Sequence, residues 1–120
     1  MIVACIELEP SLGTRKSMLE ILQFVERGLL NNPACLSCGI YEKTDQQRTI
    51  RYEEKWESEH SFRRHIRSRS YLALLNAMDM AQSEPKISFS EVTNTRSMEL
   101  IEALRSREAE AKGEMTDEDR

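Results

Sequence analysis

Four short stretches of the chain have the residue spacing and composition of β-strands: residues 2–8, 36–43, 50–56 and 87–92. The third shows the pattern most clearly, since Tyr52, Glu54 and Trp56 share one face while charged residues occupy the other. A two-residue period of this kind is typical of a strand with one covered face. We therefore predict four strands, with the face that bears Trp56 turned towards a core.

Between these stretches the apolar residues recur every three or four positions, which predicts helices. The first helix begins near Thr14, a suitable N-cap, and ends near Gly28. Its apolar stripe consists of Met18, Ile21, Leu22, Val25 and Leu29. Ser58 can cap a second helix, and a third helical segment follows a break at residues 68–70 and continues to about Met80. The helices are long enough to cover one face of a small sheet.

The order strand, helix, strand, strand, helix, strand is that of the split β-α-β unit. It predicts an α+β, ferredoxin-like fold, a four-stranded antiparallel sheet with helices on one face. Apolar groups are expected on both faces, because Ala4 and Ile6 alternate with Val3 and Cys5. A small sheet with two apolar faces needs a second covering layer. We therefore predict a homodimer with the sheet faces opposed and related by twofold symmetry.

The end of the chain extends beyond this unit. We divide the sequence into a domain at 1–93, a C-terminal helical extension at 94–111 and a charged tail at 112–120 that we expect to be disordered. The extension has a weak apolar stripe with Met98 and Ile101, which suggests docking on the body or on a partner subunit.

Composition excludes several classes of function. The chain has 120 residues and a net charge of −4, which argues against nucleic acid as a partner. A basic cluster lies in and just after the second predicted helix, and we interpret it as a solvated face, with an anion site as the alternative. Its members are Arg63, Arg64, Arg67 and Arg69. No apolar run reaches the ~18 residues of a membrane span, and the N-terminus lacks a signal-peptide pattern. A cytoplasmic protein is expected.

Three cysteines do not imply a closed disulfide framework. Cys5 is expected to be a small buried hydrophobe. Cys35 and Cys38 form a Cys-x-x-Cys, but residues three apart on a strand point to opposite faces. Apart from these, the chain offers only His60 and His65 as soft metal ligands, so we predict no metal site. We interpret the Cys35–Cys38 spacing as a coincidence, with a redox pair as the alternative.

The end of the third strand and the helix after it hold the candidate chemistry. His65 follows Phe62 by three positions on the helical stripe and can point back towards Trp56, the only tryptophan. An indole and an imidazole facing one space are suited to binding a flat aromatic ligand. The alternative is that Trp56 is a core anchor and His65 a satisfied residue at the edge of the core.

Several of these residues also carry a family resemblance. The sequence Glu54-Lys55-Trp56-Glu57-Ser58 followed by His65 resembles the antibiotic biosynthesis monooxygenase domain of the dimeric α+β barrel superfamily. Weaker similarity is found at Pro33-Ala34-Cys35, at Tyr41 and at Ser68-Arg69-Ser70-Tyr71. The match extends over roughly residues 1–93.

The resemblance implies oxidation of a quinol-like or polycyclic aromatic by O₂ without a metal or flavin, so no cofactor is expected. Trp56 would then line the substrate space, and His65 would be the proton donor or acceptor. Further candidates for the pocket wall are Tyr52, Phe62, Tyr71 and Leu75.

Two departures from the family limit this expectation. Tyr52 stands where some polyketide-oxidising members have an asparagine. Haem-degrading members have a histidine near the positions of Leu74 and Leu75 and an asparagine near those of Ala4 and Cys5. This chain has neither residue type there, so haem degradation is disfavoured. Two hypotheses stay open, a cofactor-independent monooxygenase and a non-catalytic dimer that binds a small ligand or a partner protein.

Overall fold

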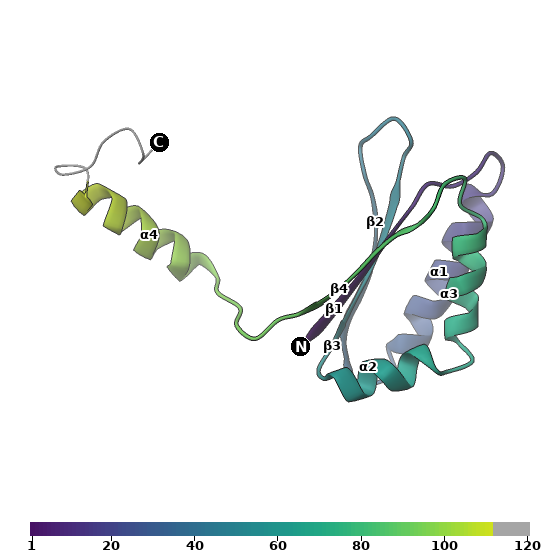
Figure 1. Cartoon of the computed structure of the whole chain (residues 1–120), viewed down its shortest axis with the longest axis horizontal. Helices are drawn as coiled ribbons and strands as arrows, with labels where there is room; N and C mark the ends of the chain where they lie inside the picture. Colours follow the sequence, from purple (N-terminus) through teal and green to yellow (C-terminus); the bar gives the residue numbers. More distant parts are fainter. Residues whose placement is uncertain (112–120) are drawn as a thin grey trace.

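The predicted strands form one antiparallel sheet in a computed structural model, which describes residues 1–111. The strands are β1 (Ile2–Leu8), β2 (Cys35–Glu42), β3 (Ile50–Trp56) and β4 (Lys86–Glu91), in the sheet order β2-β3-β1-β4. The helices are α1 (Arg15–Leu29), α2 (Glu59–Ile66), α3 (Tyr71–Asp79) and α4 (Met98–Ala111). The first three helices lie on one side of the sheet (Figure 1). The α+β, ferredoxin-like prediction is confirmed.

Alternation along the two central strands creates the inner face of the sheet. On β3 every second side chain from Ile50 to Trp56 is buried. The register places Ile2 of β1 opposite Trp56 and Ala4 opposite Glu54. Since directly opposed residues of antiparallel strands project to the same side, both strands turn these side chains towards the helices.

Helix α1 covers this face with the predicted stripe. Its buried residues are Met18, Leu22, Val25 and Leu29. Thr14 occupies the N-cap position as predicted, but its side chain makes no capping bond. Its hydroxyl instead donates to the carbonyl of Ser11 at 2.9 Å and lies 3.2 Å from the carbonyl of Met80. The start of α1 is therefore tied to the end of α3.

Helix α2 begins where the sequence predicts. Ser58 has extended backbone geometry, and its Oγ accepts a hydrogen bond from the backbone N–H of Ser61 at 3.2 Å. This bond satisfies one of the unpaired N–H groups of the first turn. Phe62 and His65 are the buried residues of α2, so the helix holds His65 against the end of β3.

A β-bulge corrects the prediction for Cys35 and Cys38. The register of β2 against β3 shifts between Cys35 and Ser37, so that Cys35 pairs with Trp56 and Cys38 with Glu54. The extra residue in the bulge is Leu36, whose side chain is exposed. Both thiols therefore share the helix-facing side of the sheet instead of pointing to opposite faces.

The outer face of the sheet is more polar than the alternation predicts. Arg51 forms ion pairs with Glu7 at 3.6 Å and with Glu53 at 3.1 Å, and Lys55 lies 3.9 Å from Glu53. Cys5 is the one buried residue of β1 on this face. A single chain holds one half of the barrel that the resemblance implies, and the dimeric barrel stays a prediction.

The C-terminal helix α4 projects away from the body on an extended linker, and it does not dock on its own domain (Figure 1). The radius of gyration is 19.0 Å, against about 14 Å for a compact domain of this length. Met98, Ile101 and Leu104 are consequently exposed. The predicted disordered tail at 112–120 lies outside the described residues. None of the helices within residues 1–111 combines the length and apolar character needed to cross a bilayer.

Candidate active site

A buried carboxylate on β3 connects the predicted site residues. Oε1 of Glu54 accepts a hydrogen bond from Nε1 of Trp56 at 2.9 Å. Oε2 accepts one from the hydroxyl of Tyr52 at 2.5 Å and lies 2.9 Å from Nε2 of His65. Only 2% of the Glu54 side chain and 2% of the His65 side chain is exposed. We call these four residues the Glu54 network.

Burial explains why the carboxylate of Glu54 has three hydrogen-bond partners. A carboxylate removed from water is costly unless several donors replace its hydration, and here three side chains do so. Glu54 is not among the site residues predicted from the sequence. The signal was nevertheless present, because a charged side chain on the covered face of an alternating strand must find partners inside the protein.

The aromatic rings around His65 fix its position. The imidazole stacks on the indole of Trp56 with ring centroids 4.7 Å apart and an interplanar angle of 27°. Tyr71 meets the imidazole edge-on, with centroids 5.2 Å apart. The indole of Trp56 is 0% exposed, so it lies behind His65. One face of the imidazole and its Nε2 are therefore occupied by protein groups.

A thiol extends the network on the side of β2. Sγ of Cys38 lies 3.3 Å from the hydroxyl of Tyr52, to which it can donate. Burial, together with the charge of Glu54, raises the pKa of the Tyr52 phenol far above its ordinary value. Burial also raises the pKa of Cys38 to about 12. Both groups therefore act as neutral donors at physiological pH.

Cys38 is accordingly expected to resist alkylation in the folded protein. At pH 8 we expect iodoacetamide to modify Cys38 more than about tenfold more slowly than in the urea-unfolded chain, because the thiolate is the nucleophile. Peptide mass mapping of timed samples measures the rate of alkylation, and equal rates in the folded and unfolded chain would contradict the prediction.

The raised pKa of Cys38 also makes the stability of the fold depend on pH. The stability contributed by the neutral thiol is present below pH 9.0 and is lost as the pH rises towards 12.

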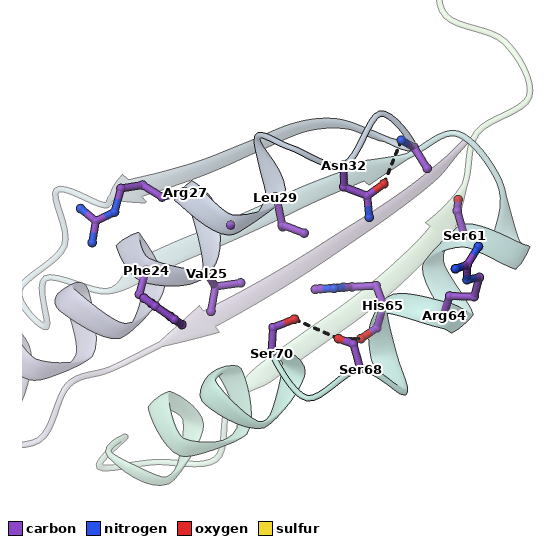
Figure 2. A pocket seen from close by; sticks show the side chains of 12 residues that line it. Phe24, Val25, Arg27, Leu29, Asn32, Ser61, Arg64, His65, Ser68 and Ser70 are labelled. Atoms are coloured by element: carbon purple, nitrogen blue, oxygen red, sulfur yellow. Dashed lines mark hydrogen bonds between the residues drawn. The ribbon is translucent and has the colours of Figure 1, made fainter.

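A cavity of about 620 Å³ lies next to His65. It is bounded by α1, the segment after it, α2 and the α2–α3 turn (Figure 2). Phe24, Val25 and Leu29 line it from α1, and Ser61, Arg64 and Ser68 line it from the opposite side. His65 is the one member of the Glu54 network that reaches the cavity wall.

The other predicted pocket residues lie elsewhere. Trp56 stacks behind His65 and Tyr52 faces Glu54, so neither is part of the cavity wall. Phe62 packs towards Phe89 of β4 with ring centroids 5.3 Å apart and borders a separate groove of about 370 Å³. Leu75 is 44% exposed on α3 and lines neither space.

Tyr71 contacts the cavity only indirectly, through the imidazole of His65. The sequence does not predict the contribution of α1 to the cavity. Phe24, Arg27 and Gly28 lie on the side of α1 away from its buried stripe, and no spacing rule assigns such residues to a cavity.

Comparison with known proteins places this geometry in a family. No curated protein matches the chain. Among solved structures, Rv0793 from Mycobacterium tuberculosis aligns with a TM-score of 0.72 at 15% identity, covering 80% of this chain and 98% of the other. A conserved protein from Methanosarcina mazei aligns with a TM-score of 0.70 at 16% identity, covering 77% and 92%. A candidate antibiotic biosynthesis monooxygenase from Deinococcus radiodurans gives 0.72 at 15%, covering 82% and 98%.

At these identities the structural neighbours establish the fold alone. The sequence family is established separately, by a family model that matches residues 1–77 and therefore includes every member of the Glu54 network. The chain thus belongs to the antibiotic biosynthesis monooxygenase family.

Proposed function

We propose that this chain is a cofactor-independent monooxygenase that oxidises a small quinol-like or polycyclic phenol with O₂. The observation that carries the proposal is the position of His65, which lines the cavity while Glu54 holds its Nε2 at 2.9 Å. A proton acceptor at a cavity wall, oriented by a buried carboxylate, is the arrangement that general base catalysis needs.

The contact with Glu54 determines which ring nitrogen of His65 can react. A carboxylate accepts but does not donate, so the imidazole carries its hydrogen on Nε2 and keeps the lone pair on Nδ1. Nδ1 has no hydrogen-bond partner within residues 1–111. It is therefore the atom assigned to take a proton from a substrate in the cavity, with Glu54 as a positioning residue that stabilises the resulting imidazolium.

The proposed reaction needs no group beyond substrate, O₂ and this base. For an anthrone-like phenol, the ring CH₂ loses a proton to Nδ1 of His65, and the carbanion gives one electron to O₂. The substrate radical and superoxide then combine in a C–O bond, and the peroxide takes the proton back from His65. Loss of water leaves a C=O group, so one oxygen atom enters the product and the other leaves as water.

Trp56 has an indirect role in this proposal. Its indole supports the imidazole by stacking at 4.7 Å and donates to the same carboxylate as His65. It therefore fixes the geometry of the base rather than contacting the substrate. This assignment differs from the expectation that Trp56 lines the substrate space.

The test is oxygen consumption against a panel of hydroquinones and anthrone-like phenols. His65→Gln is expected to lower the rate at least about a hundredfold, because a positioned base contributes that much or more. His60→Gln is the matched control, since His60 is the only other histidine and lies exposed on the same helix. Equal rates in wild type and His65→Gln would contradict the assignment of the base.

We also propose that the chain forms a homodimer through the sheet. Support comes from the outer sheet face, which no helix of the described chain covers. Val3 of β1 and the exposed Tyr41 of β2 lie on that face, opposite Lys55 and Arg51 of β3. Light scattering at micromolar concentration is expected to give the mass of two chains. A mass equal to one chain would contradict the proposal.

The second candidate function is a non-catalytic module that binds a ligand or partner protein. The observation that favours it is α4, which presents Met98, Ile101 and Leu104 to solvent at a distance from the body. Absence of oxygen uptake across the whole phenol panel, in a protein that still binds aromatic ligands, would favour this candidate.

A further inference from the structure

The cavity beside His65 has two chemically different ends (Figure 2). The apolar end is formed by Phe24 and Val25 of α1, with Leu29 one turn further along. At the other end Asn32 and Arg64 bring hydrogen-bond donors to the wall, and His65 lies between the two ends. A ligand that fills this cavity therefore needs a flat apolar body and a group that accepts hydrogen bonds.

Charge identifies the accepting group. None of the described residues that line the cavity is acidic, although the chain as a whole carries a net charge of −4. Arg64 makes no ion pair with any described residue, whereas its neighbour Arg63 is paired with Glu59 at 3.1 Å. The guanidinium of Arg64 thus keeps its positive charge uncompensated at the donor end.

The side chain of Asn32 provides a second hydrogen-bond donor at the same end of the cavity. Its Oδ1 accepts the backbone N–H of Ala34 at 3.1 Å, which assigns the other end of the amide to Nδ2. The Nδ2 group makes no hydrogen bond to a described residue, and the side chain points from the loop after α1 towards the cavity (Figure 2). An amide N–H and a guanidinium fork together match the two oxygens of a carboxylate.

We propose that the ligand of this cavity is an aromatic acid, with its carboxylate on Arg64 and the Asn32 amide and its ring against Val25 and Leu29. Oxidation of that ring rests on the proposed function, whereas binding of the acid does not. This binding mode places a ring carbon or phenol beside His65 and assigns specificity for acidic over neutral aromatics to Arg64. The two arginines of α2, which the sequence predicts to lie on a solvated face, then differ in role: Arg63 pairs with Glu59, and Arg64 binds the ligand.

The experiment uses calorimetric binding of a hydroxynaphthoate and of its uncharged carboxamide to the full chain. The wild type is expected to bind the acid at least about fivefold more tightly than the amide. Arg64→Gln should abolish this preference by weakening the acid alone, and added salt should reduce it in the wild type.

Arg27→Gln is the matched control. Arg27 also lines the cavity, but its guanidinium points away from it (Figure 2), so the same loss of charge should change acid binding less than about twofold. Equal weakening by the two substitutions would show a general field effect and overturn the proposal. Equal affinity for acid and amide, or no binding of either, would overturn it as well.

Binding is measured without turnover, so the two proposals fail separately. Acid-selective binding without oxygen uptake would leave the ligand assignment standing and remove the oxygenase. Uptake with neutral quinols, combined with no preference for the acid, would leave the oxygenase standing and remove the ligand assignment.

Discussion

Replacing Glu54 with alanine is expected to lower the free energy of unfolding by about 3 kcal/mol or more. The reason is that three buried donors lose their acceptor together, the hydroxyl of Tyr52, Nε1 of Trp56 and Nε2 of His65. Each unsatisfied buried group costs about 1–3 kcal/mol. Urea unfolding followed by circular dichroism measures the change.

Glu54→Gln separates the structural role of this residue from its catalytic one. The amide has the same shape, but it offers one acceptor where the carboxylate offers two. If its oxygen keeps the bond to Trp56, its NH₂ group faces His65 and favours the tautomer with the hydrogen on Nδ1. We therefore expect a smaller loss of stability than in Glu54→Ala and a loss of oxygen uptake close to that of His65→Gln.

Glu53→Gln is the control for this pair of substitutions. Glu53 is the next residue on β3, lies on the outer face and pairs with Arg51 and Lys55 at a partly exposed site. Such pairs contribute little to stability, so the unfolding curve should move only slightly. A Glu54→Ala protein as stable as Glu53→Gln would show that the Glu54 network does not hold the core together.

The alternation of residues 50–56 was enough to predict which side chains of β3 are buried, because burial on one face of a sheet imposes a two-residue period. The same pattern places Glu54 beside Trp56 on the buried face of the strand. The pattern does not identify His65 as the partner of Glu54. His65 lies eleven positions further along, on a helix whose orientation depends on tertiary packing. The hydrogen bonds of the Glu54 network are therefore seen only in the structure, although the sequence already places Glu54 on the buried face.

Two differences from the sequence predictions have local causes. A bulge at Leu36 reverses the side on which Cys35 projects, and a single inserted residue leaves no mark in a run of mixed polarity. The cavity lies beside His65 rather than Trp56 because the indole packs fully beneath the imidazole. Periodicity assigns faces, but it does not order the layers of side chains within one face.

Trp56→Ala is expected to lower the free energy of unfolding by about 3–5 kcal/mol. The indole is 0% exposed and contacts Phe62 as well as His65, so alanine leaves a large cavity at the centre of the core. The substitution also removes the donor to Oε1 of Glu54. Thermal or urea unfolding of the purified variant measures the sum of these effects.

Trp56→Phe separates the loss of packing from the loss of the hydrogen bond to Glu54. A phenyl ring preserves most of the packing and can still stack on the imidazole, but it cannot donate to Glu54. We expect about 1–2 kcal/mol of destabilisation from the lost hydrogen bond and the smaller ring. Because the bond between Glu54 and His65 remains, oxygen uptake should fall far less than in His65→Gln.

That comparison decides how Trp56 acts. If the indole only positions the base, the activity of Trp56→Phe should fall only as far as the site becomes less stable. The Michaelis constant for the aromatic substrate should then stay close to that of wild type. A large rise in the Michaelis constant with an unchanged maximal rate would instead indicate that the substrate touches the indole directly. In that case His65 would have to move aside on binding, because its imidazole covers the indole of Trp56.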